Sequence, residues 1–428
     1  MSPVPSEAVI EAPPAARALL RDADLVFVLS LLDRDGEAAR LVGGALRNAL
    51  LARPVHEFDI ATTAPPELVM DRARKAQVRC VATGLDHGTV TLVVSGRPFE
   101  VTSLREDVET DGRRAKVRFS RDFAGDAMRR DFTVNALSMS LDGRLYDYAG
   151  GLADIAARRL RFIGDPVQRI REDYLRILRF FRFAADYSEG PLDRAGLSAC
   201  MRERDGLTRL SRERIRNEIL KLLAARRAGE ITEEICETGL LGPLLGAAPN
   251  PARFTNLLRR AAAERPDALL GLAALCVNVP EDAQNLRERL RLSNAEERRL
   301  CAAAEAFIAL HGHHRPPPAQ MLLRLLFRHG RQAACDALAL ARAEALPATA
   351  DDWSRALDYL SGVQEPQLPF SGADLLAHGV PGGRAVGVAL KDLQARWIEA
   401  GFPQDPRRLA ELLDAAARAA TDANTDEA

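Results

Sequence analysis

The stretch LVGGALRNALLARPVHEFDIAT, residues 41–62, decides how the first part of the chain folds. An apolar strand ends at Val42, and Gly43 and Gly44 let the backbone approach a ligand before residues 45–51, which have the composition of a helix. A strand, a glycine turn and a helix N-terminus together favour anions. The stretch lacks the G-x-x-x-x-G-K-[ST] of a P-loop and the G-x-G-x-x-G of a dinucleotide site. It therefore predicts a phosphate cradle of another kind.

Carboxylates follow this cradle closely in the sequence. Residues 56–60 alternate polar and apolar side chains, so as a strand they place Glu57 and Asp59 on one face. Glu100 lies on a later predicted strand and adds a third acid. Mg²⁺ takes near-octahedral oxygen ligation and bridges substrate phosphates, so converging acids of this kind are what it needs. The alternative for each acid is an ordinary solvent-facing side chain.

Length and composition limit the possible functions. A chain of 428 residues with 47% hydrophobic residues predicts two to four folded domains. Its net charge of −1 means that any nucleic-acid surface is a local patch. Six scattered cysteines without a C-x-x-C pair indicate buried thiols in a reducing compartment. Because the N-terminus lacks a signal peptide and residues 268–279 are too short to cross a bilayer, we expect a cytoplasmic protein with no membrane contact.

The order of predicted elements divides the chain into an α/β part and a helical part. Residues 17–32 and 67–76 read as helices, residues 78–81, 89–94 and 99–103 as strands, and residues 95–98 as a hairpin turn. Residues 105–121 carry many charges and few apolar side chains, which predicts a mobile loop. After Gly150 and Gly151 the composition becomes helical, and residues 151–182 hold eight arginines against four acids. Such a basic segment suits RNA phosphates.

Two short motifs carry further chemistry. Residues 129–137 read RRDFTVNAL, in which a carboxylate can accept from a hydroxyl while guanidinium groups neutralise phosphate. Residues 172–176 read EDYLR and are predicted to begin a helix on which Asp173 and Arg176 share a face. Taken alone, the first motif indicates a surface charge cluster and the second an intrahelical ion pair.

Taken in this order, the motifs resemble those of nucleotidyltransferases with a polymerase-β-like palm. Within that group the chain is similar to class II CCA-adding enzymes (tRNA nucleotidyltransferases) and bacterial poly(A) polymerases. The resemblance spans roughly residues 40–223 and implies an α+β fold: a mixed-sheet palm with helices, followed by all-α neck, body and tail domains. It also implies a leader at residues 1–22, a palm at 23–148, a neck at 149–248, and a body and tail at 249–428 that bind tRNA.

The resemblance assigns roles to twelve residues. It implies Mg²⁺ held by Glu57 and Asp59, and an Asp131 that binds the ribose 2′-hydroxyl. The catalytic candidates are Glu57, Asp59 and Glu100, and the nucleotide-binding candidates are Gly43, Gly44, Arg47, Arg129, Arg130, Asp131, Asp173, Arg176 and Arg179. The family usually has aspartate where this chain has Asn48 and Glu57, and glycine where it has Ala52.

The EDxxR motif acts in this interpretation as a protein template for the incoming base. Cytosine and adenine both present an amino donor beside a ring-nitrogen acceptor, whereas uracil and guanine present a carbonyl beside N–H. Asp173 can accept from the amino group while Arg176 donates to the ring nitrogen. Such a pair would admit CTP and ATP and leave polar groups unpaired against UTP or GTP.

Three functions follow as hypotheses. The first is a template-independent tRNA nucleotidyltransferase that adds C, C and A to the 3′ acceptor end of tRNA from CTP and ATP by a two-metal mechanism. The second is a poly(A) polymerase on the same palm. The third is a catalytically weakened tRNA-binding protein in which Glu57 has spoiled metal geometry. In the resembled family the loop at residues 105–121 serves addition of the terminal adenosine, which favours full CCA addition over a CC-only enzyme. No obligate protein partner is evident.

Overall fold

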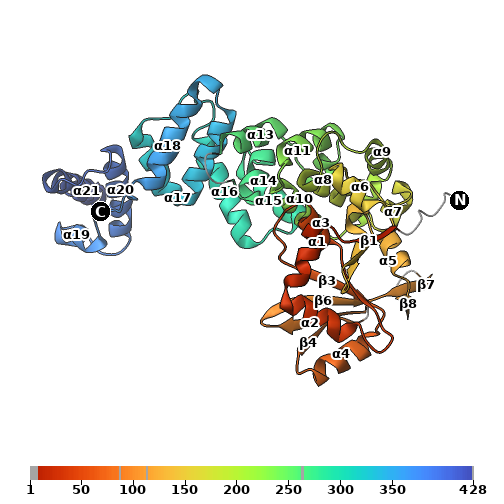
Figure 1. Ribbon diagram of the computed structural model, residues 1–428. Helices are drawn as coiled ribbons and strands as arrows, with labels where there is room; N and C mark the ends of the chain where they lie inside the picture. Colours follow the sequence, from red (N-terminus) through yellow and green to blue (C-terminus); the bar gives the residue numbers. More distant parts are fainter. Residues whose placement is uncertain (1–7, 86–87, 112–113, 262–264, 427–428) are drawn as a thin grey trace. The chain divides into compact units, whose positions relative to one another are not determined.

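The computed structural model describes residues 8–85, 88–111, 114–261 and 265–426 (Figure 1). The chain forms two compact units, Met1–Ile231 and Thr232–Ala428. The predicted α/β part lies in the first unit, and the boundary between the units falls inside the predicted neck. No described helix is long and apolar enough to span a membrane.

An eight-stranded mixed sheet forms the frame of the first unit. Its strand order is β1-β10-β9-β2-β3-β6-β5-β4, and of these pairs β3–β6 is parallel and the others are antiparallel. The strands are β1 Ala8–Glu11, β2 Ala39–Val42, β3 Phe58–Thr62, β4 Arg79–Gly84, β5 Thr89–Val94, β6 Arg97–Ser103, β9 Leu137–Ser140 and β10 Arg144–Asp147. The α+β prediction for this part is confirmed.

Helices join and cover these strands. α2 packs against β2, β3 and α4, α4 packs against β4 and β5, and α3 contacts β2, β3 and β9. The helices are α1 Pro14–Arg17, α2 Ala23–Leu32, α3 Gly44–Leu50, α4 Pro66–Lys75, α5 Phe123–Arg129, α6 Gly151–Ala156, α7 Pro166–Glu172, α8 Leu175–Tyr187, α9 Arg194–Arg202 and α10 Arg212–Leu223. Figure 1 shows the all-helical segment α6–α10 following the sheet in the chain.

Three local predictions need correction. The predicted helix at 17–32 is interrupted at Asp22, whose side chain accepts from the Leu25 N–H and begins α2 afresh. The predicted leader contains β1, which pairs with β10 as an edge strand. The hairpin turn is shorter than predicted, because Ser95 and Gly96 alone turn the chain with positive φ and Pro98 lies inside β6.

The predicted mobile loop at residues 105–121 is instead a β-hairpin. β7 Arg105–Asp111 pairs antiparallel with β8 Arg114–Phe119 as a separate two-stranded sheet. The prediction was wrong because it weighed charge above pattern: residues 115–119 alternate apolar and basic, which is the strand period. Only the tip, residues 112–113, lies outside the described residues.

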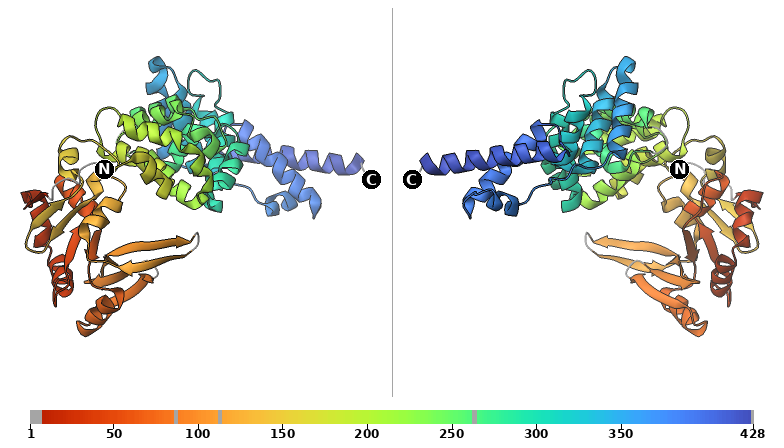
Figure 2. Two further views of the ribbon diagram at one scale, coloured as in Figure 1. Left: turned by 90° about the vertical axis from the view of Figure 1, so that its right-hand side faces the viewer. Right: turned by 90° about the vertical axis from the view of Figure 1, so that its left-hand side faces the viewer.

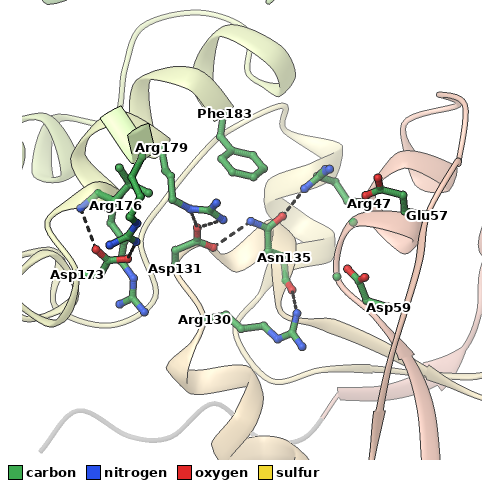
Figure 3. A pocket seen from close by; sticks show the side chains of 14 residues that line it. Arg47, Glu57, Asp59, Arg130, Asp131, Asn135, Asp173, Arg176, Arg179 and Phe183 are labelled. Atoms are coloured by element: carbon green, nitrogen blue, oxygen red, sulfur yellow. Dashed lines mark hydrogen bonds and ion pairs between the residues drawn. The ribbon is translucent and has the colours of Figure 1, made fainter. Parts of the chain in front are cut away.

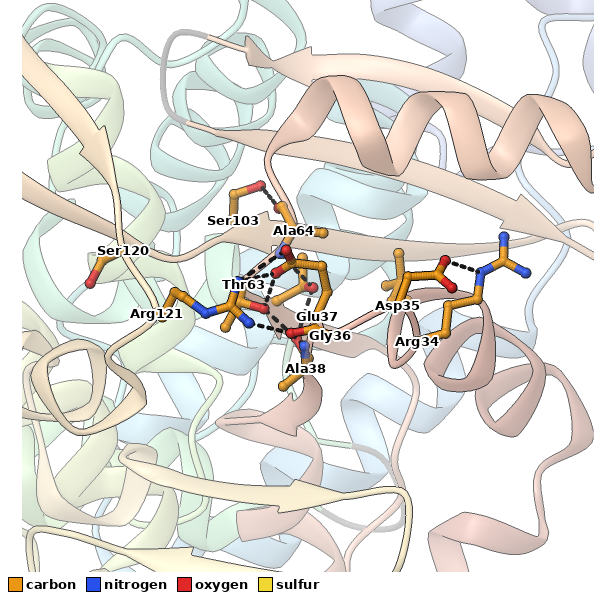
Figure 4. Close-up of polar contacts among 12 residues, drawn as sticks. Arg34, Asp35, Gly36, Glu37, Ala38, Thr63, Ala64, Ser103, Ser120 and Arg121 are labelled. Atoms are coloured by element: carbon orange, nitrogen blue, oxygen red, sulfur yellow. Dashed lines mark hydrogen bonds and ion pairs between the residues drawn. The ribbon is translucent and has the colours of Figure 1, made fainter.

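A polar cluster fixes the base of this hairpin to the large sheet (Figure 4). Arg121, just after β8, donates to both carboxylate oxygens of Glu37 at 3.0 and 2.9 Å and to the Gly36 carbonyl. Thr63, just after β3, donates to Glu37 and accepts from the Ala38 N–H at 2.8 Å. The bonds from Thr63 and Arg121 lower the pKa of Glu37. The end of the hairpin is therefore held beside β2 and β3.

The EDYLR motif spans a helix break rather than opening one helix. α7 ends at Glu172, Asp173 has extended backbone (φ −154°, ψ 105°), and α8 begins at Leu175. The Asp173 side chain accepts from the Leu175 N–H at 3.1 Å, as short acidic side chains do where they compete with helical hydrogen bonding. The prediction that Asp173 and Arg176 share a helical face is wrong.

A buried aromatic cluster joins the RRD motif to α8. The Phe132 ring lies 4.9 Å from Phe162 and 5.4 Å from Phe183, and Phe162 stacks on Phe180 at 5.4 Å. Phe132 and Phe180 are fully buried. Aromatic pairs at these separations add about 1 kcal/mol each beyond the area they bury. The cluster thus holds the residue next to Asp131 against the helix that carries Arg179.

The second unit is helical throughout its described residues, as predicted (Figure 2). Its two tryptophans, Trp353 and Trp397, are fully buried core residues. Helices wholly within it are α12 Leu241–Leu245, α13 Pro251–Arg260, α14 Ala268–Cys276, α15 Pro280–Leu290, α16 Asn294–Ile308, α17 Ala319–Glu344, α18 Ala350–Gly362, α19 Gly372–Ala377, α20 Arg384–Glu399 and α21 Pro406–Asp426, while α11 Ala228–Glu237 includes the boundary.

A buried arginine closes the C-terminal end of α14. Arg253 donates to the carbonyls of Ala274 at 2.6 Å and Val277 at 2.8 Å, and it pairs with Glu344 at 3.1 Å. Its side chain is 1% exposed. The last carbonyls of a helix have no intrahelical partner, so Arg253 supplies bonds that water supplies elsewhere.

We predict that Arg253→Leu destabilises the protein by about 3 kcal/mol or more, because it leaves several buried carbonyls without a donor. Urea denaturation measures the change in the free energy of unfolding. Arg259→Leu is the matched control, since Arg259 is an exposed arginine on the same helix. Equal stability losses in the two variants would contradict this role for Arg253.

A second buried charge supports the first unit. Asp154 on α6 is fully buried and accepts from Thr133 Oγ1 at 2.6 Å, Arg159 Nε at 2.9 Å and Arg161 Nε at 2.9 Å. Burial by itself raises the pKa of Asp154, but Arg161, Thr133 and Arg159 outweigh it and the pKa is lowered. The carboxylate is therefore stabilised in its charged form.

Replacing this carboxylate by Asp154→Asn should cost about 3 kcal/mol of unfolding free energy at neutral pH. The pKa of Asp154 in the folded protein lies below its value in the unfolded chain, about 3.9. The wild type is therefore more stable than the variant by the full amount above about pH 4, and this difference in unfolding free energy disappears as the pH falls through the folded pKa. Urea denaturation at pH 7 and at pH 3 measures the difference in unfolding free energy between wild type and variant at each pH. Asp71→Asn, at a surface aspartate paired with Arg74 and Lys75, should have little effect; a pH-independent loss for Asp154→Asn would rule out the charge as its cause.

Candidate active site

Most of the predicted site residues meet in one pocket of about 550 Å³ in the first unit (Figure 3). Ten of the twelve candidates line it, and Glu100 and Arg129 do not. The lining residues are Gly43, Gly44, Arg47, Glu57, Asp59, Arg130, Asp131, Asn135, Asp173, Leu175, Arg176, Arg179, Phe183 and Arg214. Five arginines against four acids make this pocket suited to a polyanionic ligand that carries a metal ion.

The glycine turn forms one wall of the pocket. Gly43 has φ +69° and precedes α3, a conformation that L side chains rarely adopt. A Cβ at Gly43 would lie 3.0 Å from Arg130 Nη1. The positive φ and the closeness of the Arg130 guanidinium both require glycine at residue 43. This agrees with the predicted phosphate cradle.

Arg47 lies on the pocket wall with its charge already oriented. It is 6% exposed and donates to Asn135 Oδ1 at 2.5 Å and to Tyr187 Oη at 2.9 Å. Its guanidinium carbon lies 3.9 Å from the centre of the Tyr187 ring. Burial lowers the pKa of Arg47, yet arginine stays charged at neutral pH. The residue therefore presents a nearly immobile positive charge.

Two departures from the family pattern have visible local reasons. Asn48 accepts from the Arg47 guanidinium at 3.0 Å and donates its amide N–H to the Pro54 carbonyl at 3.3 Å. An aspartate could not make the second bond. Ala52 has φ +54°, a left-handed conformation that glycine adopts at lower cost, which explains why glycine is the usual residue there.

The predicted metal-binding acids lie around the start of β3. The sequence predicted Glu57 within this strand, but the residue lies just before it. Both Glu57 and Asp59 line the pocket. Asp59 pairs in register with Glu100 on β6. Burial raises the pKa of Asp59 although the residue as a whole is exposed at the surface. Arg130 opposes this rise in the pKa, and Glu57 adds to it. Burial and then the charges of Asp59 and Glu57 raise the pKa of Glu100.

These acids fit a divalent cation. Mutual repulsion among carboxylates is what a bound cation relieves, and Mg²⁺ uses one or two protein carboxylates together with substrate phosphates. Within the described part of the chain, no group of three or more histidine, cysteine, aspartate or glutamate side chains forms a ready-made metal cage. The pair Glu57 and Asp59 is therefore the donor set that the pocket offers.

Asp131 is the most strongly held acid of the site. It is 7% exposed, and one of its oxygens accepts from Arg179 Nε at 2.7 Å and Nη2 at 2.6 Å. The other accepts from Asn135 Nδ2 at 3.0 Å and the Phe132 N–H at 2.9 Å. Burial alone raises the pKa of Asp131, but Arg179, Asn135 and Phe132 outweigh it and the pKa is lowered. Asp131 is thus an anion that orients Arg179 and Asn135.

The EDYLR residues have different partners from those predicted. Asp173 accepts from Arg214 Nη2 on α10 at 2.7 Å. Arg176 pairs with Glu172 at 2.8 Å and donates to the Arg129 carbonyl at 3.1 Å. Asp173, Arg176 and Arg214 all line the pocket, so the motif presents its acid and one arginine to the same space as an arginine from α10.

Four lining residues were not among the sequence candidates: Asn135, Leu175, Phe183 and Arg214. Asn135 lies within the RRDFTVNAL motif, four residues after Asp131, so the motif could have indicated it. Arg214 is 41 residues from its partner Asp173, and no local pattern indicates that contact.

Comparisons with known families cover most of the chain. Residues 39–161 match the Poly A polymerase head domain, residues 192–265 match a family described as an RNA- and SrmB-binding site of polymerase A, and residues 266–413 match domain 2 of tRNA nucleotidyltransferases. These matches lie in the same order as the predicted palm and helical domains.

Relatives and solved structures agree with these matches. The chain is 33% identical to CCA tRNA nucleotidyltransferase 1, mitochondrial, of Danio rerio, over 91% of this chain and 90% of that protein. It is 29% identical to the CCA-adding enzyme of Lactobacillus johnsonii, over 90% of this chain and 95% of that protein. The crystal structure of the Bacillus stearothermophilus CCA-adding enzyme in complex with CTP matches with a TM-score of 0.71 and 27% identity, over 96% of this chain and 100% of that one. The chain belongs to the family of CCA-adding tRNA nucleotidyltransferases.

Proposed function

We propose that this protein adds C, C and A to the 3′ end of tRNA, transferring CMP, CMP and AMP from CTP and ATP with release of pyrophosphate and without a nucleic-acid template. One observation carries the proposal: a single pocket joins a glycine cradle, a pair of acids, a buried Asp131 and the acid of the EDYLR motif. Membership of the CCA-adding family supports the same reaction.

Glu57 and Asp59 are the residues that would hold Mg²⁺. A bound divalent cation there would favour the ionised form of the attacking tRNA hydroxyl and neutralise charge on the leaving pyrophosphate. Glu57 precedes the first paired residue of β3, so its backbone is not fixed by the sheet and its additional methylene is more easily accommodated than it would be at Asp59. This placement supports catalysis over the hypothesis of a weakened RNA-binding protein.

The remaining residues hold and select the nucleotide. Gly43, Gly44, Arg47 and Arg130 surround the space for a triphosphate. Asp131 already accepts four hydrogen bonds, which fills a carboxylate. A ribose 2′-hydroxyl that binds there replaces the neutral Asn135 amide more easily than the charged Arg179.

Base selection rests on Asp173. Its carboxylate can accept from the amino group of cytosine or adenine, while Arg176, or Arg214 at 2.7 Å from Asp173, donates to the ring nitrogen. Either arginine gives the same donor and acceptor order, so the preference for CTP and ATP over UTP and GTP follows from both arrangements.

Broader features of the proposal follow from the helical part and the cysteines. We assign residues 149–248 to a neck and residues 249–428 to a body and tail that bind tRNA, supported by the family matches at 192–265 and 266–413. A reducing compartment, the cytoplasm, is supported by six free cysteines.

The decisive experiment is incorporation into a tRNA transcript that lacks its CCA end, with Mg²⁺ and each of the four nucleotides alone and together. We expect addition limited to C, C and A. Long A tails with ATP alone would instead identify a poly(A) polymerase, and binding of tRNA without incorporation would identify a weakened enzyme.

Asp59→Asn should reduce incorporation by at least about a thousandfold, because it removes a negative ligand of the metal while keeping the shape of the side chain. Thermal unfolding of the variant should match that of the wild type, since this carboxylate makes no structural bond in the described residues. Glu57→Asp should retain activity. Near-normal turnover in Asp59→Asn would reject the metal assignment.

Asp173→Ala should weaken base selection before it weakens metal binding. We expect the ratio of kcat/KM for CTP over UTP to fall at least tenfold, because the acceptor for the amino group is lost. Asp205→Ala, at an exposed aspartate of the following helical segment, serves as the control. Unchanged ratios in Asp173→Ala would show that another group reads the base.

A further inference from the structure

A second basic pocket adjoins the first, and the proposed chemistry leaves it without a role. Its volume is about 640 Å³, and its lining includes five arginines, two acids and two threonines. It shares Arg130 and Arg176 with the candidate active site. The arginines it adds are Arg105 at the start of β7, Arg129 at the end of α5 and Arg169 on α7.

Each of its two acids is shared between two arginines of the pocket. Asp126 is shared by Arg129 at 2.9 Å and Arg130 at 3.1 Å. Glu172 is likewise shared by Arg169 at 2.7 Å and Arg176 at 2.8 Å. Each guanidinium carries five N–H donors, so one carboxylate between two arginines holds them in place and leaves donors and positive charge for another anion.

The position of this pocket in the sheet indicates which anion. Thr102 lies two residues beyond Glu100 on β6, on the same face, and pairs with Thr89 on β5. Two residues along a strand correspond to about 7 Å. Thr102, which lines the second pocket, therefore lies about 7 Å along β6 from Glu100, the register partner of Asp59.

The sheet also shows where each pocket lies relative to the acids. Across the sheet the order is β2, β3, β6, β5. The glycine cradle follows β2, the acids Asp59 and Glu100 lie on β3 and β6, and Thr102 and Thr89 lie on β6 and β5. Because β2 runs antiparallel to β3 with Val42 opposite Asp59, the cradle lies toward the start of β3, whereas Thr102 lies toward the end of β6. Along the sheet the acids therefore lie between the cradle and Thr102, and Arg130 lines both pockets. Phosphoryl transfer needs the attacking and leaving oxygens roughly in line.

We propose that the second pocket binds the terminal phosphates of the RNA strand whose 3′-hydroxyl attacks, and that Arg105, Arg129 and Arg169 are its phosphate contacts. This rests on the proposed function, because it assigns the pocket that Thr102 lines to the other substrate. It moves Arg129 from the nucleotide, where the sequence placed it, to the RNA. The tripeptide Arg129-Arg130-Asp131 then faces both substrates.

The test is the double variant Arg105→Gln/Arg129→Gln, compared with wild type and with Arg79→Gln, an exposed arginine on β4 outside both pockets. Steady-state kinetics with tRNA lacking CCA should give a KM for tRNA raised about tenfold and a KM for CTP unchanged. Direct binding of the same tRNA, without nucleotide, should weaken by a similar factor. The slope of log Kd against log salt should fall by about 0.7 per lost phosphate contact.

The outcomes separate this inference from the proposed function. An inactive wild type would reject the function, while the binding measurement would still support the pocket if the variant alone lost tRNA affinity. A raised KM for CTP, or weaker product inhibition by pyrophosphate, with unchanged tRNA binding would assign the pocket to the nucleotide and overturn the inference. Unchanged values throughout, or an equal loss in Arg79→Gln, would overturn it as well.

Discussion

The buried ion pair between Asp131 and Arg179 is the interaction on which the site depends. Asp131 comes from the segment after α5 and Arg179 comes from α8. Asp131 is only 7% exposed, so the bond between the two residues is buried. Removing such a charge from water costs several kcal/mol unless it is paired and fully hydrogen-bonded. Four bonds to Asp131 meet that requirement. The α/β part and the helical neck segment of the first unit therefore meet in one defined arrangement at the nucleotide pocket.

The aromatic cluster beneath this pair explains why the arrangement is rigid. Phe132 follows Asp131 and packs against Phe183, which lies one turn beyond Arg179 on α8. Polar and apolar contacts thus run in parallel between the same two segments. Arg182 continues the polar contact to Glu218 on α10 at 2.5 Å. A charge network supported by packed rings keeps several arginines close together, which their mutual repulsion would otherwise oppose.

Sequence patterns predicted the parts of the fold that depend on near neighbours. The turn at Gly43, the strand at Asp59 and the helix predicted at 67–76 each follow from a few adjacent residues, and all three occur. The hairpin at 105–119 was missed because its charges concealed a strand period. The break at Asp173 was missed because it depends on one side chain accepting from the backbone N–H of Leu175, the first residue of the next helix. The contact of Asp173 with Arg214 depends on packing of α8 and α10, so only the folded chain defines it.

The three departures from the family pattern lie on one short segment, residues 48–57, so together they determine the path of the backbone into β3. Asn48 bonds the Pro54 carbonyl, Ala52 turns the chain with positive φ, and Glu57 ends the segment just before β3. Asp59, in contrast, lies within the paired strand, between neighbours in register on β2 and β6. The sheet therefore fixes one acid, and the segment that carries all three departures sets the position of the other. A longer carboxylate at residue 57 requires adjustment only in that segment, while a change at residue 59 would have to move the sheet.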